Sequence, residues 1–288
     1  MTARESRESR AALLSRLLPD DRPDQLPVQQ GQFHTVVIGA DRVVRLPRTP
    51  AAAARLPGGA DALRLLAALD LGVRTPEPLA EGSGEQPYLV LTRLPGEPLP
   101  PEALDDDRVA ESAAAQVAAL LGALSRTGRD GAVRAQLPAA QAPSRRWREF
   151  AEGVRAELFP LLSDGGRLRA ERELAALDGI PDRTDALVHG DLGPENLLWE
   201  RAHGLPRLAG VLDWDDVALG DRAEDLAAVG AGYGDGFLRR VLALGGAPDS
   251  TLATRVSAIR GTFALQQALC ALRDGDTDEL ADGLAGYR

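Results

Sequence analysis

The hydrophobic pattern of the chain changes once, near residue 94, and this change limits the folds that are possible. Before it, short β-branched or apolar runs at Phe33–Ile38, Val43–Leu46 and Tyr88–Leu91 predict strands, the first two joined as a hairpin. After it, apolar residues recur at mixed spacings of three and four, as in amphipathic helices. We therefore predict an α+β chain with a small β-rich part, residues 1–94, and a larger mainly helical part, residues 95–288.

Regular apolar spacing also gives the expected helices. The leucines between positions 13 and 18 form one helical stripe, and Asp61–Leu71 forms another that should end at Gly72. The helices expected in the second part span Val109–Leu124, Ser144–Leu162, Leu168–Leu177, Phe237–Leu244 and Thr251–Leu272. Small strands that carry loops are expected among them at Ala186–His189, Asn196–Trp199 and Leu208–Leu212.

Composition narrows the class of protein. With 44% hydrophobic residues in 288, the chain can bury a large core. Its one cysteine, Cys270, excludes an internal disulfide framework and is interpreted as a small buried residue on a helix. The N-terminus lacks the apolar stretch of a signal peptide, and no run approaches the ~18 apolar residues of a spanning helix, so we expect a cytoplasmic protein without a membrane partner.

Charge narrows the possible partners. The net charge is -10 and no basic run occurs, which disfavours nucleic acid and suits a cationic small molecule. No obligatory protein partner is evident. All 33 basic residues are arginine, lysine is absent, and the only asparagine is Asn196. Because asparagine is so rare in this chain, the position of Asn196 carries more information than that of a common residue type.

One loop carries the strongest chemical pattern. Between two short apolar runs, Asp191 is followed by four residues and then Asn196, with His189 two positions before the acid. This spacing matches the catalytic loop of kinases, in which the Asp accepts the proton of the substrate hydroxyl and the Asn binds magnesium. Gly190 stands where that pattern has Arg. The tripeptide His-Gly-Asp is common in proteins, so by itself it is as consistent with a structural role as with a catalytic one.

A second carboxylate follows the next strand. Asp213 ends the apolar run Val211–Leu212, as the metal-binding Asp of the kinase D-F-G element ends its strand. It could be an ordinary acid at a strand end. Together with Asn196 it predicts two oxygen donors for Mg²⁺, whose charge would offset that of a transferring phosphoryl group, while Asp191 orients the attacking hydroxyl.

The catalytic loop, the element Asp213–Asp215 and the stretch Gly220–Ala227 resemble the aminoglycoside phosphotransferase family of antibiotic kinases. Further segments resemble its viomycin and capreomycin kinase branch nearly end to end: Gly31–His34, Asp41–Val44, Leu69–Gly72, Gly261–Ala268, Ala281–Leu284 and Gly286–Arg288. The resemblance implies a protein-kinase-like two-lobed fold and ATP-dependent transfer, with GTP not excluded, to a seryl hydroxyl of a cationic tuberactinomycin cyclic peptide antibiotic. Such transfer would confer resistance.

The resemblance also implies roles for nucleotide-binding residues. The family holds the phosphates with a lysine on the third strand, and here an arginine must replace it, either Arg45 or Arg48. Asp61 is the expected acidic partner, near the start of the following helix. Gly31 would lie in the loop that covers the phosphates, Gln29–His34. The backbone groups of Thr92 and Leu94 would bind adenine, and these two residues complete the expected nucleotide site.

Supporting and substrate-binding roles follow in the same way. Asp225 is expected to accept hydrogen bonds from the catalytic loop backbone, and His189 to be structural. The acids expected to ring the antibiotic are Asp215, Asp216, Asp235 and Asp274, although surface acids are usually only solvated.

Other functions remain open at this point. An aminoglycoside, macrolide or other small-molecule hydroxyl kinase would share the core motifs. A pseudokinase would keep the fold for nucleotide binding alone, although the base and the metal ligands are all present. A metal-dependent hydrolase is disfavoured, because the three histidines show no H-x-x-x-H spacing.

Overall fold

The computed structural model describes all residues except 1–2, 23, 32, 85, 138–140 and 246–248. The chain forms two compact units. The first unit comprises Met1–Leu99 and Glu195–Asp215, and the second comprises Pro100–Pro194 and Asp216–Arg288. A single division near residue 94 therefore does not describe the structure, because Glu195–Asp215 return to the first unit.

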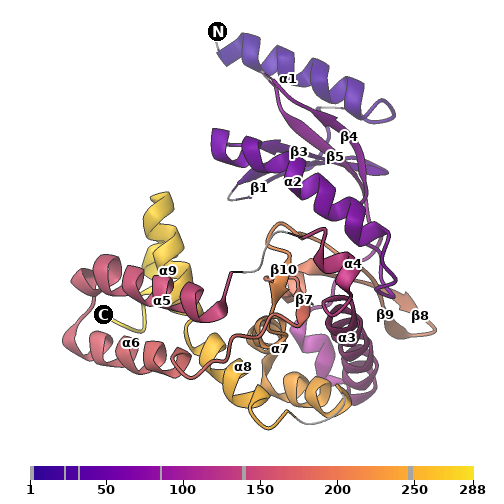
Figure 1. Cartoon of the computed structure of the whole chain (residues 1–288). Coiled ribbons are helices and arrows are strands. Elements are labelled where there is room, and N and C mark those ends of the chain that lie inside the picture. The colour runs from indigo at the N-terminus through magenta and orange to yellow at the C-terminus, as the bar shows by residue number, and fades with distance from the viewer. Residues whose placement is uncertain (1–2, 23, 32, 85, 138–140, 246–248) are drawn as a thin grey trace. The chain divides into compact units, whose positions relative to one another are not determined.

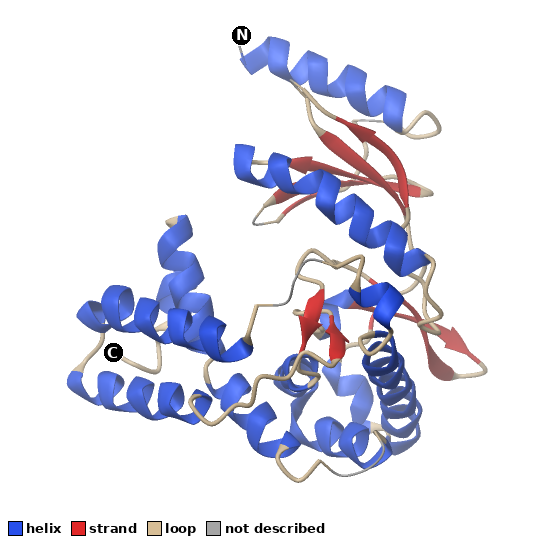
Figure 2. Ribbon diagram, viewed as in Figure 1, coloured by secondary structure: helices blue, strands red, loops and turns tan. Residues whose placement is uncertain are grey.

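A five-stranded antiparallel sheet forms the body of the first unit, in the order β1-β2-β3-β5-β4. Its strands are β1 (Val28–Gln30), β2 (His34–Ile38), β3 (Arg42–Pro47), β4 (Pro78–Gly82) and β5 (Tyr88–Thr92). They are drawn as arrows in Figure 2. The predicted hairpin is confirmed, with Val36 opposite Arg45 and Ile38 opposite Val43.

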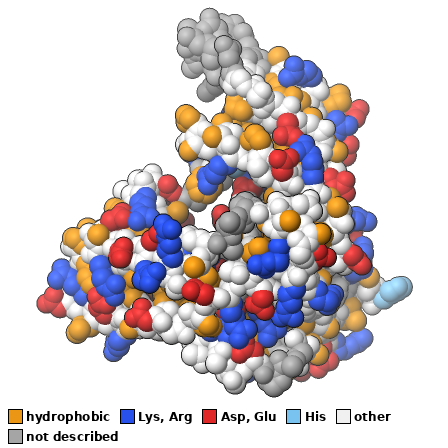
Figure 3. Space-filling model, viewed as in Figure 1, with side chains coloured by type: hydrophobic (Ala, Val, Ile, Leu, Met, Phe, Trp, Pro, Cys, Tyr) orange, Lys and Arg blue, Asp and Glu red, His pale blue; other side chains and the backbone are white. Residues whose placement is uncertain are grey.

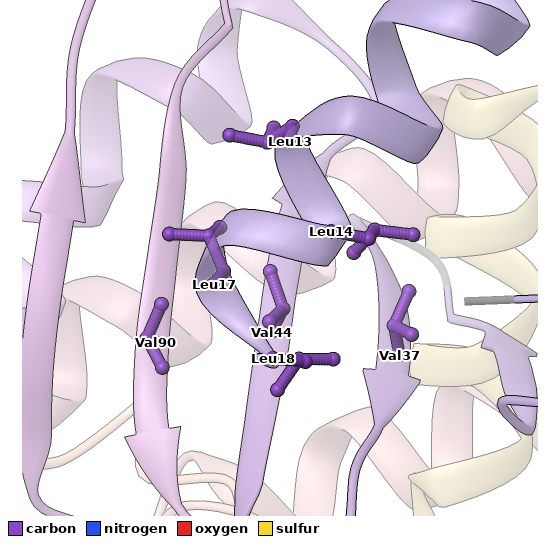
Figure 4. Close-up of a cluster of buried hydrophobic side chains, with 7 residues drawn as sticks. All are labelled: Leu13, Leu14, Leu17, Leu18, Val37, Val44 and Val90. Carbon is purple, nitrogen blue, oxygen red and sulfur yellow. The ribbon is translucent and has the colours of Figure 1, made fainter. Parts of the chain in front are cut away.

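Two helices cover the two faces of this sheet (Figure 1). Helix α1 (Ala3–Leu17) packs its leucine stripe, continued by Leu18, on Val37, Val44 and Val90 from three neighbouring strands (Figure 4). The predicted stripe is thus confirmed. Helix α2 (Pro50–Ala67) lies on the opposite face, so a helix packs on each face of the sheet, while the edge strands β1 and β4 stay largely exposed.

Helix α2 begins earlier than the sequence pattern predicts. Thr49 caps it, since the Thr49 side chain accepts a hydrogen bond from the N–H of Ala52 at 3.1 Å. The predicted start near Asp61 is wrong, because Pro57 and the glycines after it lie inside the helix instead of breaking it. Asp61 is therefore a mid-helix residue.

A second, three-stranded sheet completes the first unit. It has the order β6-β8-β9, from β6 (Glu97–Pro98), β8 (Leu197–Ala202) and β9 (Leu205–Val211). The segment before β4 bonds to this sheet through its backbone. The N–H of Arg74 donates to the carbonyl of Ala209 at 3.2 Å, and the carbonyl of Arg74 accepts from the N–H of Val211 at 3.0 Å. This pairing secures the returning segment in the first unit.

Helices dominate the second unit, as predicted (Figure 2). They are α3 (Asp107–Thr127), α4 (Gly131–Arg134), α5 (Pro143–Gly153), α6 (Asp164–Leu177), α7 (Ala223–Leu244), α8 (Leu252–Gly261), α9 (Phe263–Asp274) and α10 (Thr277–Gly283), with short 3-10 turns at Pro101–Asp105 and Phe159–Leu161 and a π-helical turn at Val154–Leu158. A further 3-10 turn, Pro194–Asn196, begins in the second unit and ends in the first. Strands β7 (Ala186–Val188) and β10 (Ala218–Gly220) form an antiparallel pair.

Two predicted helices are interrupted. The run Ser144–Leu162 is α-helical only to Gly153 and then passes through a π-helical and a 3-10 turn, where Pro160 cannot continue the α-helical hydrogen bonds. The run Thr251–Leu272 breaks at Thr262, whose hydroxyl donates back to the carbonyl of Ile259 at 2.7 Å. Local side-chain bonding thus overrides a continuous apolar pattern.

Cys270 lies on α9 as expected, but it is exposed, so its interpretation as a buried residue is wrong. No helix in the described part of the chain is long and apolar enough to cross a membrane.

Candidate active site

A cavity of about 550 Å³ opens on one face of the five-stranded sheet, lined only by residues of the first unit. Because side chains alternate between the two faces of a strand, Val36 and Arg45 face the cavity while Val37 and Val44 face α1. The cavity lining includes Gln29, Val36, Ile38, Val43, Arg45, Leu63, Leu91, Thr92, Arg93, Leu94, Asn196, Leu198, Leu212 and Asp213. It therefore has apolar walls and a few polar groups, as small-molecule sites do.

The β8–β9 hairpin brings Asn196 and Asp213 to this cavity together. Leu197 pairs with Val211 at the end of the hairpin. One residue further, the N–H of Leu212 donates to the carbonyl of Asn196 at 2.8 Å. Both predicted metal ligands line the cavity, so the structure brings together two side chains that the sequence separates.

Asp213 has a backbone conformation that is uncommon for a residue with a side chain. Its φ is +53°, in the left-handed region. The next residue anchors this turn, because Trp214 is 2% exposed and its indole N–H donates to the carbonyl of Val211 at 3.0 Å. Such strain persists where the surroundings fix it, and it is concentrated at functional sites.

The donor set at this end of the cavity fits a magnesium ion. A carboxylate from Asp213 and an amide oxygen from Asn196 are hard oxygen ligands, which Mg²⁺ prefers, and it usually takes only one or two carboxylates from a protein. Nitrogen or sulfur ligands that would favour zinc are not part of the cavity lining.

Arg45 lies on β3 and carries the positive charge of the cavity. Its Nη1 and Nη2 donate to Oδ1 and Oδ2 of Asp215 at 2.8 and 2.5 Å, and Nη2 also reaches Oδ1 of Asp213 at 3.3 Å. Burial alone would lower the pKa of Arg45, but the hydrogen bonds and charges of Asp215 and Asp213 outweigh it and raise that pKa. Asp215, predicted to bind the antibiotic, is instead the main partner of Arg45.

The expected acidic partner of Arg45 is elsewhere. Asp61 is 78% exposed at its side chain and forms an ion pair with Arg64 at 2.8 Å, one turn along α2. The prediction that Asp61 pairs with Arg45 is therefore wrong, because α2 begins earlier and turns Asp61 outward. Arg48 donates to the carbonyl of Gly31 at 2.7 Å, so Arg45, which lines the cavity, is the better candidate for holding phosphate.

The sequence places His34 only at the end of the predicted phosphate loop, with no role of its own, and the structure places it beside Arg45. His34 is 7% exposed, and its Nδ1 lies 3.1 Å from Nη2 of Arg45. Burial, and next the charge of Arg45, lower the pKa of His34 to about 4. The signal that could have found it is strand alternation, because His34 and Val36 share one face of β2, the face of the cavity.

The connector after β5 lines the cavity, as the predicted adenine contacts require. Thr92 and Leu94 both belong to the lining. The N–H of Thr92 donates to the carbonyl of Glu77 at 2.9 Å, and the N–H of Arg93 to that of Asp41 at 2.9 Å, so the connector backbone is held from both sides. Gly31 lies at the tip of the β1–β2 hairpin, outside the cavity lining, and Gln32 of the predicted phosphate loop is outside the described residues.

The catalytic loop belongs to the second unit up to Pro194. Asp225 is buried on α7, and its two carboxylate oxygens accept hydrogen bonds from the N–H groups of His189 and Gly190, each at 3.0 Å. The N–H of Asp191 in turn donates to Nδ1 of buried His189 at 3.2 Å. Burial raises the pKa of Asp225 to about 6, although its interactions with His189 and Gly190 act to lower it. The loop backbone is thus fixed, while Asp191 is exposed.

Gly190 replaces the arginine of the kinase pattern for a visible reason. Its φ is +92°, and a Cβ at this position would lie 2.9 Å from the Cβ of Asp216. Only glycine adopts this conformation without strain.

The remaining acids predicted to bind the antibiotic differ in their surroundings. Asp235 forms an ion pair with Arg260, which neutralises it and argues against its predicted role. Asp216 lies against the catalytic loop at Gly190, and Asp274 accepts a weak bond from Sγ of Cys270 at 3.7 Å. Acidic and basic side chains are mixed over the face seen in Figure 3, so the net charge is not concentrated in one block there.

Comparisons with known proteins agree with this geometry. The sequence profile described as "Phosphotransferase enzyme family" matches residues 26–254. A viomycin phosphotransferase of Streptomyces vinaceus is 62% identical over 285 residues, 98% of this chain and 99% of the relative.

Solved structures give the same fold at lower identity. The GDP and kanamycin complex of an APH(2") enzyme has a TM-score of 0.83 at 24% identity, covering 96% of each chain. Macrolide 2'-phosphotransferase type I has a TM-score of 0.75 at 22% identity, covering 100% of this chain and 98% of the other. These similarities show a shared fold.

Proposed function

The chain belongs to the phosphotransferase enzyme family, and from this premise we propose that it transfers the γ-phosphoryl group of ATP to a seryl hydroxyl of viomycin or a related tuberactinomycin. One observation carries this proposal, the 62% identity to viomycin phosphotransferase over 98% of the chain. The aminoglycoside and macrolide enzymes share the fold at 24% identity or less, so they favour neither of those substrates here.

The cavity of the first unit is the proposed nucleotide site. The connector Leu91–Leu94 forms the wall against which adenine would lie, with the backbone of Thr92 and Leu94 as its hydrogen-bonding groups. Arg45 would hold the phosphates, since a guanidinium forms paired, charge-assisted hydrogen bonds with phosphate oxygens. GTP carries the same phosphates as ATP, so Arg45 would hold it in the same way, and the choice between the two nucleotides would rest on how the base contacts Leu91–Leu94.

Asn196 and Asp213 are the proposed ligands of Mg²⁺. A magnesium ion bound there would neutralise part of the charge on the nucleotide phosphates. The protein contributes the fixed positions of both side chains, which the β8–β9 hairpin and the buried Trp214 determine.

Asp191 is the proposed base for the hydroxyl group. The substrate oxygen forms a bond to the γ-phosphorus, the bond from that phosphorus to the β,γ-bridging oxygen breaks, and the hydroxyl proton passes to the carboxylate of Asp191. Asp225 and the side chain of His189 hold the backbone of the catalytic loop around Asp191 through the hydrogen bonds described above.

The substrate is a cation, and the chain carries a net charge of -10, which favours its approach. Asp216 and Asp274 remain the proposed contacts for its guanidino and amino groups. We place the reaction in the cytoplasm, where ATP is available, and phosphorylation there would protect the host from the antibiotic.

The direct test is mass spectrometry of viomycin and capreomycin after incubation with the enzyme, ATP and Mg²⁺. We expect one added phosphoryl group on at least one of them, and none when Asp191→Ala replaces the wild type. Kanamycin and a macrolide serve as matched acceptors. Phosphorylation of either of these, with none of the cyclic peptides, would overturn the assigned substrate.

A further inference from the structure

We propose that His34 and Asp215 are positioning residues for Arg45, and that this pair replaces the acidic partner on the following helix that the family's phosphate-binding lysine would use. The inference rests on the proposed function, in which Arg45 holds the nucleotide phosphates. It accounts for three observations: a chain without lysine, an outward-facing Asp61, and a buried histidine beside the cavity.

Arg45 is held along one edge of its guanidinium. Nη1 and Nη2 bond to the two carboxylate oxygens of Asp215 at 2.8 and 2.5 Å, which is the paired geometry that arginine and carboxylate favour. The contact to Asp213 is a single longer one at 3.3 Å. Asp215 therefore carries the guanidinium, and Asp213 keeps the role of metal ligand.

His34 completes the set from the neighbouring strand. An arginine N–H can only donate, so Nδ1 of His34 must be the acceptor of the 3.1 Å contact, and the ring proton resides on Nε2. Nε2 is buried and lacks a hydrogen-bond partner among the described residues. A buried polar atom without a partner costs free energy, which indicates that the ring is kept for its contact with Arg45.

This arrangement leaves part of the guanidinium for a ligand. Arginine has five N–H groups in a fixed fork. Within the part of the chain that the structure describes, the hydrogen bonds of Arg45 use Nη1 toward Asp215 and Nη2 toward Asp215, Asp213 and His34. Nε–H and the second Nη1 hydrogen make no such bond, so either can donate to a phosphate oxygen while the edge formed by Nη1 and Nη2 stays fixed on Asp215.

A lysine could not be held in this way and still contact phosphate. Its ammonium has three N–H donors on one nitrogen, so bonds to both oxygens of Asp215 and to His34 would use all of them. The contacts around Arg45 are therefore specific for arginine, although lysine is the family's residue.

The test compares four variants by the affinity for a non-hydrolysable ATP analogue with Mg²⁺, by KM for ATP, by kcat and by thermal unfolding. His34→Leu removes the acceptor, whereas His34→Asn keeps an oxygen near the place of Nδ1. Asp215→Asn removes the charge of the fork, and Arg45→Lys supplies the family's residue.

We expect His34→Leu and Asp215→Asn to raise KM for ATP roughly tenfold, with a smaller change in kcat, since each removes a hydrogen bond to a charged group. His34→Asn should restore KM to within about threefold of wild type by the same reasoning. Arg45→Lys should raise KM by roughly tenfold or more.

Wild-type KM and nucleotide affinity in folded His34→Leu and Asp215→Asn would overturn the inference, as would an Arg45→Lys enzyme equal to wild type. If His34→Leu does not fold, Asp215→Asn and Arg45→Lys decide the matter. Binding of the ATP analogue is measured in the absence of the antibiotic. A wild type that binds the analogue but leaves viomycin unmodified would therefore contradict the proposed function and not this inference.

Discussion

The two units each hold an arginine between two aspartates beside a cavity of similar size, about 550 Å³ in the first and 540 Å³ in the second. Arg45 is 13% exposed, and its partners Asp213 and Asp215 are 52% and 35% exposed. In the second unit, Arg255 and its partner Asp221 are only 3% and 2% exposed.

The difference lies in how completely the charges are enclosed. Arg255 donates through Nε and Nη2 to both oxygens of Asp221, at 2.6 and 3.2 Å, through Nη2 to Asp249 at 3.0 Å, and through Nη1 to Thr251 at 2.6 Å. Every nitrogen of that guanidinium is used within the fold. The cluster around Arg45 is open on one side and keeps unused N–H donors, which supports the proposal that the first cavity binds a ligand. The size of the cavity does not separate the two clusters.

Removing the enclosed arginine should have the largest effect. Arg255→Met leaves the carboxylate of Asp221 buried without its guanidinium, which should lower the free energy of unfolding by about 3–5 kcal/mol. Urea denaturation measures this. Arg129→Ala is the matched control, because the Arg129–Asp185 pair lines the same cavity but is exposed, and its loss should cost no more than about 1 kcal/mol. Equal losses for the two variants would contradict the distinction.

Removing an acid of the open cluster should affect catalysis instead. Asp213→Ala should lower kcat/KM by about 100-fold or more, because even residues that only support metal ligands typically contribute 10–100-fold. The unfolding midpoint should stay near that of wild type, since Asp213 is half exposed and lies close to a second carboxylate. An Asp213→Ala enzyme of normal activity would remove the metal assignment.

Asp225 gives a smaller effect that depends on pH. It is as buried as Asp221, but its oxygens accept backbone N–H groups, and its pKa is raised to about 6. The folded state therefore binds a proton that the unfolded state releases above the usual aspartate pKa, so this group's contribution to stability falls as pH rises through 6.

Between pH 5 and 7 the loss should be about 1 kcal/mol. Urea denaturation at both pH values, in wild type and Asp225→Asn, measures it. The variant should lack this part of the pH dependence. An identical pH dependence in the two proteins would show that Asp225 does not titrate in this range.

Asp61 should give the smallest effect. Its ion pair with Arg64 is exposed, so Asp61→Ala should change the free energy of unfolding by no more than about 0.5 kcal/mol. KM for ATP should stay within about twofold of wild type, because Asp61 does not contact Arg45. A tenfold rise in steady-state KM would restore Asp61 as the partner of the phosphate-binding residue.

Local pattern was enough to predict much of the fold and part of the site. The β2–β3 hairpin and the leucine stripe of α1 follow from spacing within a few residues, and both are confirmed. Asn196 and Asp213 were predicted as a pair because residue type and spacing together are restrictive, and a single hairpin brings both to the cavity.

Contacts between distant parts of the chain could not be predicted. Arg45 and Asp215 are 170 positions apart, and a strand-end acid next to a predicted metal ligand gives no sign that it faces β3. The sequence pattern does not predict the early start of α2, because proline is disfavoured inside a helix and Pro57 lies within this one. For the same reason it predicts Asp61 at the start of the helix instead of near its middle. Tertiary packing decided both cases.

A crystal structure with a non-hydrolysable ATP analogue and Mg²⁺ tests the central claim most directly. We predict the base against Leu91–Leu94 and the phosphates at Arg45, Asn196 and Asp213, in the cavity of the first unit. A nucleotide bound instead in the arginine-lined cavity at Arg255, with the first cavity empty, would contradict it.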